Sequence, residues 1–360
     1  MQWRKNRMAM GAVVFFALLG LTLWAVSTRN RQPSQAGEIP SFDLDKNAIT
    51  TLEIVRPGNT PIVLSKVDDA WRVTEPVDAT ADSSNVESAL KRLAELKITR
   101  IVAAKPEHYA RLEVDDQHAV HVVAKAGEDT VAELVVGKYG NGVTMVRIDD
   151  RPEVFGASGS LRYAFDRELK SWRDRKVVNV DATNVRSIRF ENANGTFEFQ
   201  REGESWTALA GKKDLKELKG FNPKQLNSKL STVTRLIASG FAPEETSPAR
   251  AGLTEPKATV TLTLMEDPNA IVLELGDRTE GASELYLRRS GDPTIYLIPE
   301  YLAERLQPDA EAFRAPLEPP APPPQPNAQP RDAQQPKLPP EIMRQLQEQI
   351  RAQQQQRGQP

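Results

Sequence analysis

The stretch AWRVTEPVDATADSSNVESALKRLAELK, residues 70–97, joins a strand-like run containing a tryptophan to a polar break and then to leucines at helical spacing. A second stretch, SWTALAGKKDLKELKGFNPKQLNSKLSTVTRLIASGF at residues 205–241, repeats this order about 135 residues later. In each stretch, apolar residues three apart would share one face of a helix: Leu90 and Leu93 in the first, Leu230 and Val233 in the second. The recurrence predicts two copies of one structural unit.

Strand-like segments flank both predicted helices. A hairpin of alternating apolar residues is predicted ahead of each helix, ending at Trp71 in the first copy and at Trp206 in the second. Further strands follow each helix, and an amphipathic segment closes each copy, with Trp172 and Phe313 at matching positions. The interval between matching positions grows to about 141 residues, which places the extra residues in loops. Two unrelated α+β domains that resemble each other by chance are the alternative.

The tryptophans suggest how each copy would form a core. A twisted hairpin buries only one face and is marginally stable alone. A helix laid across that face would cover it, and a tryptophan at the corner could bury roughly 200 Å². We therefore interpret eight residues as structural anchors: Trp71, Trp206, Leu90, Leu93, Leu230, Val233, Trp172 and Phe313.

The N-terminus has the pattern of a membrane anchor. Met8–Val26 is an uncharged, mostly apolar run between two basic clusters, and a helix of this length would span roughly 29 Å, about the thickness of a hydrocarbon core. Trp3 and Trp24 would lie near the two interfaces. The alternative is a cleaved signal peptide with its cleavage site at Ser34–Ala36, although such a peptide would have a shorter apolar region. We predict an uncleaved anchor over residues 8–27.

The orientation of this anchor follows from the flanking charges. Arg4, Lys5 and Arg7 precede the apolar run, whereas Arg29 and Arg31 follow it. The narrow excess favours a cytoplasmic N-terminus. We therefore expect a single-pass protein of a bacterial inner membrane with the bulk of the chain in the periplasm.

The C-terminal part of the sequence, after Arg314, changes in composition. Proline and glutamine dominate residues 316–360, which cannot build a core and are expected to form an extended, disordered tail. Near the end, four apolar residues would share one face of a short helix at 341–352: Ile342, Met343, Leu346 and Ile350. This helix is either a docking handle that folds on a partner or part of a solubilising tail.

These patterns predict both the domain organisation and the fold class. The predicted parts are a cytoplasmic N-terminus at 1–7, the transmembrane anchor at 8–27, a linker at 28–45, repeat 1 at 46–179, repeat 2 at 180–315 and the Pro/Gln-rich tail at 316–360. We expect the α+β class, with two tandem repeats after one N-terminal transmembrane helix. Each repeat would contain a β-hairpin, a helix, antiparallel strands and a closing helix.

The composition disfavours several classes of function. The formal net charge is -2, so the chain lacks the basic excess that attracts nucleic acid. Cysteine is absent, which excludes disulfides, thiolate metal sites and thiol nucleophiles. We expect no cofactor and no metal.

The residues that could carry chemistry are few. The loop with Gly156 and Gly159 does not fit a phosphate-binding motif and is interpreted as a turn. Three histidines, His108, His118 and His121, lie close together in sequence, and we interpret them as surface residues rather than as convergent metal ligands. The acidic pairs are typical of turns rather than of an acid–base site: Asp68-Asp69, Asp115-Asp116 and Asp149-Asp150. We expect the protein not to be an enzyme.

One set of residues follows the pattern of a known family: Trp71, Pro76, Ala81, Asp82, Val86, Leu90, Leu93, Gly137 and the SWRDRKV segment at Ser171–Val177. Through these residues the chain resembles, over roughly residues 70–315, the DUF4340 family of bacterial proteins, which has no assigned activity. The second copy lacks the proline–Ala–Asp run after Trp206 and carries GKKDLKELKG instead, so it is a diverged half. The resemblance implies an envelope protein that accompanies ABC-type transport systems, including some linked to gliding motility.

We therefore expect a non-catalytic, membrane-anchored envelope protein. It would be an accessory or scaffold subunit of an ABC-transporter-type or related envelope complex. The alternative is a periplasmic module that binds a ligand or an envelope polymer in the cleft between the repeats.

Overall fold

The computed structural model describes residues 39–40, 44–209, 218–281 and 283–314. The predicted anchor at 8–27 lies outside the described residues, as does the tail at 316–360 with Ile342, Met343, Leu346 and Ile350. Within the described ranges, no helix combines the length and the apolar character needed to cross a membrane.

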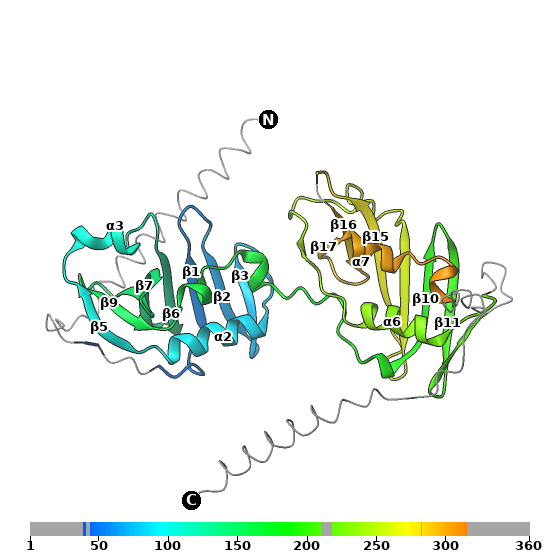
Figure 1. Ribbon diagram of the computed structural model, residues 1–360, viewed down its shortest axis with the longest axis horizontal. Helices are drawn as coiled ribbons and strands as arrows, with labels where there is room; N and C mark the ends of the chain where they lie inside the picture. Colours follow the sequence, from blue (N-terminus) through cyan, green and yellow to red (C-terminus); the bar gives the residue numbers. More distant parts are fainter. Residues whose placement is uncertain (1–38, 41–43, 210–217, 282, 315–360) are drawn as a thin grey trace, which may run out of the picture. The chain divides into compact units, whose positions relative to one another are not determined.

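The first antiparallel sheet contains nine strands in the described part of the chain, in the order β4-β3-β2-β1-β6-β7-β8-β9-β5 (Figure 1). Its strands are β1 (Thr51–Val55), β2 (Ile62–Val67), β3 (Ala70–Glu75), β4 (Ala79–Thr80), β5 (Ile98–Ala103), β6 (Val120–Ala126), β7 (Asp129–Gly140), β8 (Val143–Ile148) and β9 (Val154–Ser158). Every neighbouring pair is antiparallel. Segments far apart in the sequence, such as β1 and β6, therefore lie side by side.

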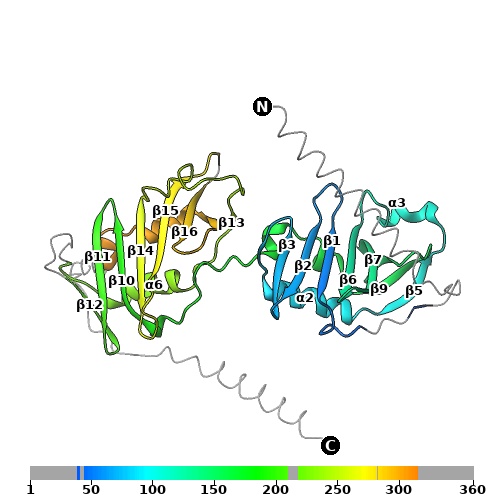
Figure 2. The ribbon, with the colours of Figure 1, turned by 180° about the vertical axis from the view of Figure 1, so that it is seen from behind.

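The second antiparallel sheet contains eight described strands, in the order β12-β11-β10-β14-β15-β16-β17-β13 (Figure 2). Its strands are β10 (Val185–Asn192), β11 (Gly195–Glu202), β12 (Ser205–Ala208), β13 (Gly240–Phe241), β14 (Ala258–Leu264), β15 (Ile271–Arg278), β16 (Glu284–Arg289) and β17 (Ile295–Pro299). The short helices of the two halves are η1 (Pro106–His108), α3 (Tyr109–Leu112), η2 (Ala182–Asn184) and η3 (Glu311–Phe313).

The two sheets share one topology. In both, a three-stranded meander leads into a helix, the chain then forms the outermost strand, and four further strands fill the gap between that strand and the meander. The helix is α2 (Ser83–Ala94) in the first half and α6 (Pro223–Thr234) in the second. Strand β4 has no counterpart among the described residues of the second half.

Each long helix begins at a polar cap and buries one apolar face. The Asp82 side chain accepts a hydrogen bond from the Asn85 amide at 3.0 Å, and the Asn222 side chain accepts one from the Lys224 amide at 3.0 Å. The buried residues lie three or four apart: Val86, Ala89, Leu90 and Leu93 in α2, and Leu226, Leu230 and Val233 in α6. These residues join the main core of their own half.

A closing segment ties each helix to the end of its repeat. The amide of Asp82 donates to the Trp172 carbonyl at 2.8 Å, and the amide of Asn222 donates to the Phe313 carbonyl at 2.9 Å. Both aromatic side chains are fully buried. The residues that follow them, Arg173 and Arg314, form bridges to the residues that precede the helix caps. The closing contact therefore recurs in both halves.

The expected α+β class is wrong, because the described residues are mostly β. The predicted hairpins and later strands do not form separate layers, since β1 pairs with β6 and β10 with β14 to make continuous sheets. The closing helices are also shorter than expected. The first is divided into α4 (Arg162–Phe165) and α5 (Leu169–Trp172), and the second is α7 (Glu300–Leu306) followed by η3. The transmembrane helix included in that expectation lies outside the described residues.

The two predicted tryptophan anchors differ in burial. Trp206 on β12 is 4% exposed and belongs to the second core. Neither tryptophan ends a hairpin as predicted, because Trp71 is the second residue of β3 and Trp206 the second residue of β12. Trp71 is half-buried against the first core. The second core also includes Val177 and Val178, which precede the predicted start of repeat 2 at residue 180.

A second repeated feature is a sharp turn that packs against a glycine of the sheet. Glu113 and Gly252 occupy corresponding positions with φ of 56° and 67°, in the left-handed region. The Leu112 carbonyl oxygen lies 2.5 Å from the position that a Cβ atom would occupy at Gly137 on β7. The Ala251 carbonyl oxygen blocks the same position at Gly276 on β15. Only glycine permits this approach.

We predict that Gly137→Ala and Gly276→Ala each lower the free energy of unfolding by about 1–3 kcal/mol, because the new methyl group would overlap backbone atoms. Gly140→Ala is the matched control, since Gly140 lies on the same strand as Gly137 and no atom lies within 4 Å of its Cβ position. Urea unfolding of the full chain in neutral detergent measures the difference. Equal losses at positions 137 and 140 would contradict the close-packing argument.

Candidate functional site

The three histidines lie at separate carboxylates. His118 Nδ1 is 2.7 Å from Asp115 Oδ1, and His121 Nε2 on β6 is 3.7 Å from an oxygen of Asp116. His108 Nε2 lies 3.5 Å from an oxygen of Glu107. Burial lowers the pKa of His121, and the charge of Asp116 opposes this shift. The described residues contain no group of three or more side chains that could hold a metal ion.

The acidic pairs lie at separate turns in the first half. Asp68 and Asp69 form the turn between β2 and β3, both with positive φ. Asp149 also has a positive φ and directly follows β8, while Asp115 accepts a hydrogen bond from the Gln117 amide. These positions give the acidic pairs a role in chain reversal, because aspartate tolerates the left-handed conformation.

The glycine-containing loop after β9 is held by hydrogen bonds from the Thr144 side chain, which sequence reasoning missed. The fully buried Thr144 hydroxyl donates to the Gly159 carbonyl at 2.6 Å and accepts from the Leu161 amide at 3.0 Å. Gly159 has a φ of 79°, whereas Gly156 lies within β9 itself. The loop is therefore a fixed turn with its outer side exposed.

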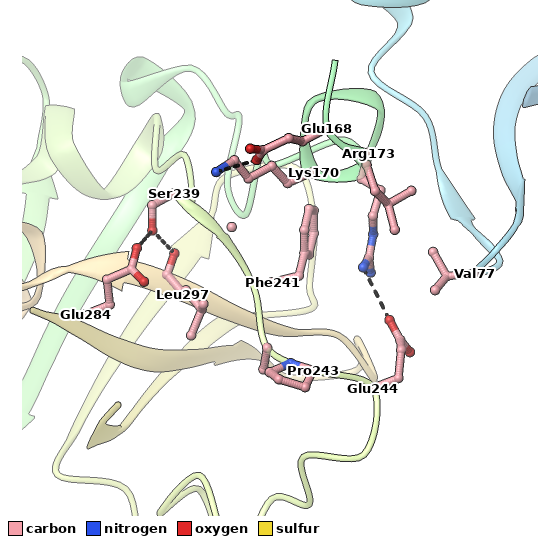
Figure 3. A pocket seen from close by; sticks show the side chains of 13 residues that line it. Val77, Glu168, Lys170, Arg173, Ser239, Phe241, Pro243, Glu244, Glu284 and Leu297 are labelled. Atoms are coloured by element: carbon pink, nitrogen blue, oxygen red, sulfur yellow. Dashed lines mark hydrogen bonds and ion pairs between the residues drawn. The ribbon is translucent and has the colours of Figure 1, made fainter. Parts of the chain in front are cut away.

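One hollow in the described part of the chain has a volume of about 440 Å³ and surrounds Arg173 (Figure 3). Its walls combine apolar side chains with paired charges. The lining residues are Val77, Glu168, Leu169, Lys170, Arg173, Ser239, Gly240, Phe241, Ala242, Pro243, Glu244, Glu284 and Leu297. This volume falls within the range of small-molecule sites.

Arg173 is the most constrained charged group of this hollow. It is 8% exposed, and its guanidinium carbon lies 3.7 Å from the centroid of the Phe241 ring. Its Nη1 donates to Glu244 Oε1 at 3.3 Å, while its buried Nε has no hydrogen-bond partner (Figure 3). Burial lowers the pKa of Arg173, and Glu244 opposes that shift. An arginine remains charged in proteins, so this is a desolvated cation with an aromatic neighbour.

The other polar groups of the hollow are matched with one another. Lys170 Nζ lies 2.9 Å from Glu168 Oε2, and Ser239 Oγ lies 2.6 Å from Glu284 Oε1. Behind Phe241, the Tyr296 hydroxyl donates to Asp292 Oδ2 at 2.8 Å, and burial raises the pKa of Tyr296. The hollow therefore offers polar and apolar contacts to a ligand, and its charged side chains are paired with one another: Lys170 with Glu168, and Arg173 with Glu244.

Comparison with known proteins identifies the class to which this duplicated β architecture belongs. The model of a family described as a domain of unknown function, DUF4340, matches residues 71–256 and again 221–316. The two matches span most of the chain, so the chain belongs to the DUF4340 family, as the resemblance indicated. The second match begins within the span of the first, and the two overlap over residues 221–256. No curated protein and no solved structure matches the chain.

Sequence reasoning singled out Gly137 but did not recognise its physical role. It also missed Thr144 and the equivalence of Glu113 in the first half with Gly252 in the second. A local signal for that equivalence exists, because ARLEV at 110–114 and ARAGL at 249–253 align around the left-handed residue. No local signal exists for the contacts of Arg173 with Phe241 and Glu244, since these residues are distant from it in sequence.

We predict that Arg173→Ala lowers the free energy of unfolding by about 2 kcal/mol, because it removes a desolvated cation from the Phe241 ring. Glu244→Gln should lower it by less than about 1 kcal/mol, since the Glu244 side chain is 66% exposed and its ion pair is screened by water. Chemical unfolding of both variants, each compared with the unsubstituted protein, measures the two losses of unfolding free energy. A Glu244→Gln loss as large as that of Arg173→Ala would show that the ion pair dominates instead.

Proposed function

We propose that this protein is a non-catalytic accessory or scaffold subunit of an envelope complex of the ABC-transporter type. Residues 8–27 would hold it in a bacterial inner membrane, with both sheets in the periplasm. The transporter part rests on what the family resemblance implies. The protein-binding part rests on the edges of the two sheets.

The observation that carries the proposal is the difference between the two edges of each sheet. Thr80 of β4 accepts a hydrogen bond from Asp174 at 2.9 Å, and Ile237, beside β13, is bridged to Lys176, so the segment 173–176 meets one edge of each sheet. At the other edges, β5 pairs with β9 and β12 pairs with β11, and no described strand lies on their outer sides. An outer strand with free main-chain groups can bind a partner by strand addition.

The sequence of the N-terminus supports the membrane location. The apolar run of residues 8–27 has the length and flanking charges of an anchor. The C-terminal segment 341–352 supplies a second candidate contact, through its apolar face.

We predict that photo-crosslinking residues at Arg100 of β5 and Thr207 of β12 join the full chain to a subunit of a membrane transport complex. Both positions are exposed and lie on the outer strands. Mass spectrometry of the adducts from intact cells identifies the partner.

Asn59 and Glu128 provide matched control positions, because they are exposed turn residues away from these edges. Adducts that form equally at the turns and at the outer strands, or that form at the turns alone, would remove the strand-addition proposal.

We predict that the full chain stays in the membrane fraction after alkaline carbonate extraction, whereas a chain without residues 8–27 is released. Protease added to spheroplasts should digest the region of the two sheets. The N-terminal sequence of the mature protein is the decisive control, since a product that begins after Ala36 would show a cleaved signal peptide.

A second candidate function is favoured by the hollow around Arg173. Its volume of about 440 Å³, its aromatic wall at Phe241 and its paired charges would suit a ligand or a segment of envelope polymer. For such a module, the crosslinking positions on the outer strands should yield no protein adduct.

A further inference from the structure

A second hollow lies wholly within the first half of the chain. It has a volume of about 400 Å³ and is formed by the end of α2, the residues after it and the loop after β9. Its lining residues are Arg92, Glu95, Lys97, Ser158, Gly159, Ser160 and Leu161.

The hollow is rich in hydrogen-bond donors that have no partner among the described residues. Arg92 and Lys97 are exposed, and neither side chain forms an ion pair or hydrogen bond within the described ranges. The hydroxyls of Ser158 and Ser160 are likewise unengaged there. The acid of the hollow, Glu95, lies 3.8 Å from Lys91, which offsets its charge. The net positive charge of the side chains that line the hollow therefore favours the binding of an anion.

The loop that carries the two serines is fixed. Thr144, which is fully buried, binds the Gly159 carbonyl and the Leu161 amide on either side of Ser160. A Cβ atom at Gly159 would lie 3.8 Å from Arg92 Nη1, so the guanidinium group is next to the loop. The backbone of this turn is therefore fixed before any ligand arrives, which lowers the entropy lost on binding.

At the corresponding described positions of the second half, neither the two cations nor the two serines nor Thr144 recurs. The register of β8 with β9 and of β16 with β17 aligns Thr144 with Leu285 and the Ser158–Gly159 pair with Pro299 and Glu300. The helix alignment places Thr232 opposite Arg92 and Ile237 opposite Lys97. Because the same fold forms without them, these donors are not required by the scaffold.

We propose that this hollow binds a phosphate group. Two cations and two hydroxyls can contact several oxygens of one phosphate, with the arginine donating two parallel bonds and the lysine acting as a point charge. The phosphate belongs either to an anionic lipid headgroup or to a free phosphate. The proposal does not rest on the accessory function proposed above.

The test follows thermal unfolding of the full chain in neutral detergent. Inorganic phosphate and dihexanoyl phosphatidylglycerol are titrated separately, each against sodium chloride of equal ionic strength. A saturable rise of the unfolding midpoint is expected with at least one probe, since a ligand that binds the native state stabilises it. Saturation at lower concentration with the lipid assigns the headgroup, and saturation with inorganic phosphate alone assigns the free ion.

The double substitution Arg92→Gln/Lys97→Gln should raise the concentration for half-maximal effect at least about tenfold, because charge-assisted bonds are lost. Lys105→Gln/Arg111→Gln is the matched control, with the same change of charge at exposed positions of the same half outside the hollow. It should leave the titration unchanged. A wild-type response no larger than that to chloride, or equal losses in the two double variants, would overturn the proposal.

Discussion

Each half of the molecule depends on the return of the chain to the start of its own helix. In the first half, the hydrogen bond from the Asp82 amide to the Trp172 carbonyl joins the end of the repeat to the start of α2. In the second half, the bond from the Asn222 amide to the Phe313 carbonyl joins the end of the repeat to the start of α6. Both bonds satisfy an amide that would otherwise be unpaired near a helix N-terminus, and both place a large aromatic side chain in the core. Without this contact the helix would cover the sheet face without a fixed position. The closing contact therefore makes the end of each repeat part of what holds its helix on the sheet.

The sequence predicted what local patterns control. The caps and apolar faces of α2 and α6 follow from residues a few positions apart, so they could be recognised directly. The fold class could not be recognised in the same way, because it depends on which strands pair. Strand β1 pairs with β6, although α2 and β5 lie between them in the sequence. This pairing joins the predicted hairpins into one sheet. Trp71 illustrates the same limit. Its position in the sequence indicates a corner, yet it lies within β3 and remains half-buried.

The candidate sites were less predictable than the fold because their residues meet only in three dimensions. Arg173 follows a tryptophan in the family segment, but its ring contact with Phe241 requires the second half of the chain to be folded. Thr144 is an ordinary strand residue in the sequence, and only its two hydrogen bonds reveal that it holds a loop. The turn at Glu113 was hidden for another reason. A charged residue occupies a left-handed position there, where the second half has Gly252.

The duplication itself separates scaffold from function. Features that occur in both halves, such as the helix caps, the buried closing aromatic and the glycines Gly137 and Gly276, are explained by folding alone. Features that occur in one half must be explained otherwise, since the other half folds without them. The cationic hollow beside Gly159 is such a feature, and its counterpart carries Glu300 instead, whose carboxylate is paired with Arg278. The two cations of the first half are thus absent from the corresponding positions, Thr232 and Ile237, while the surrounding strand order is the same. A change of this kind alters what the surface attracts and leaves the core intact, which is the way a duplicated scaffold acquires two different binding surfaces.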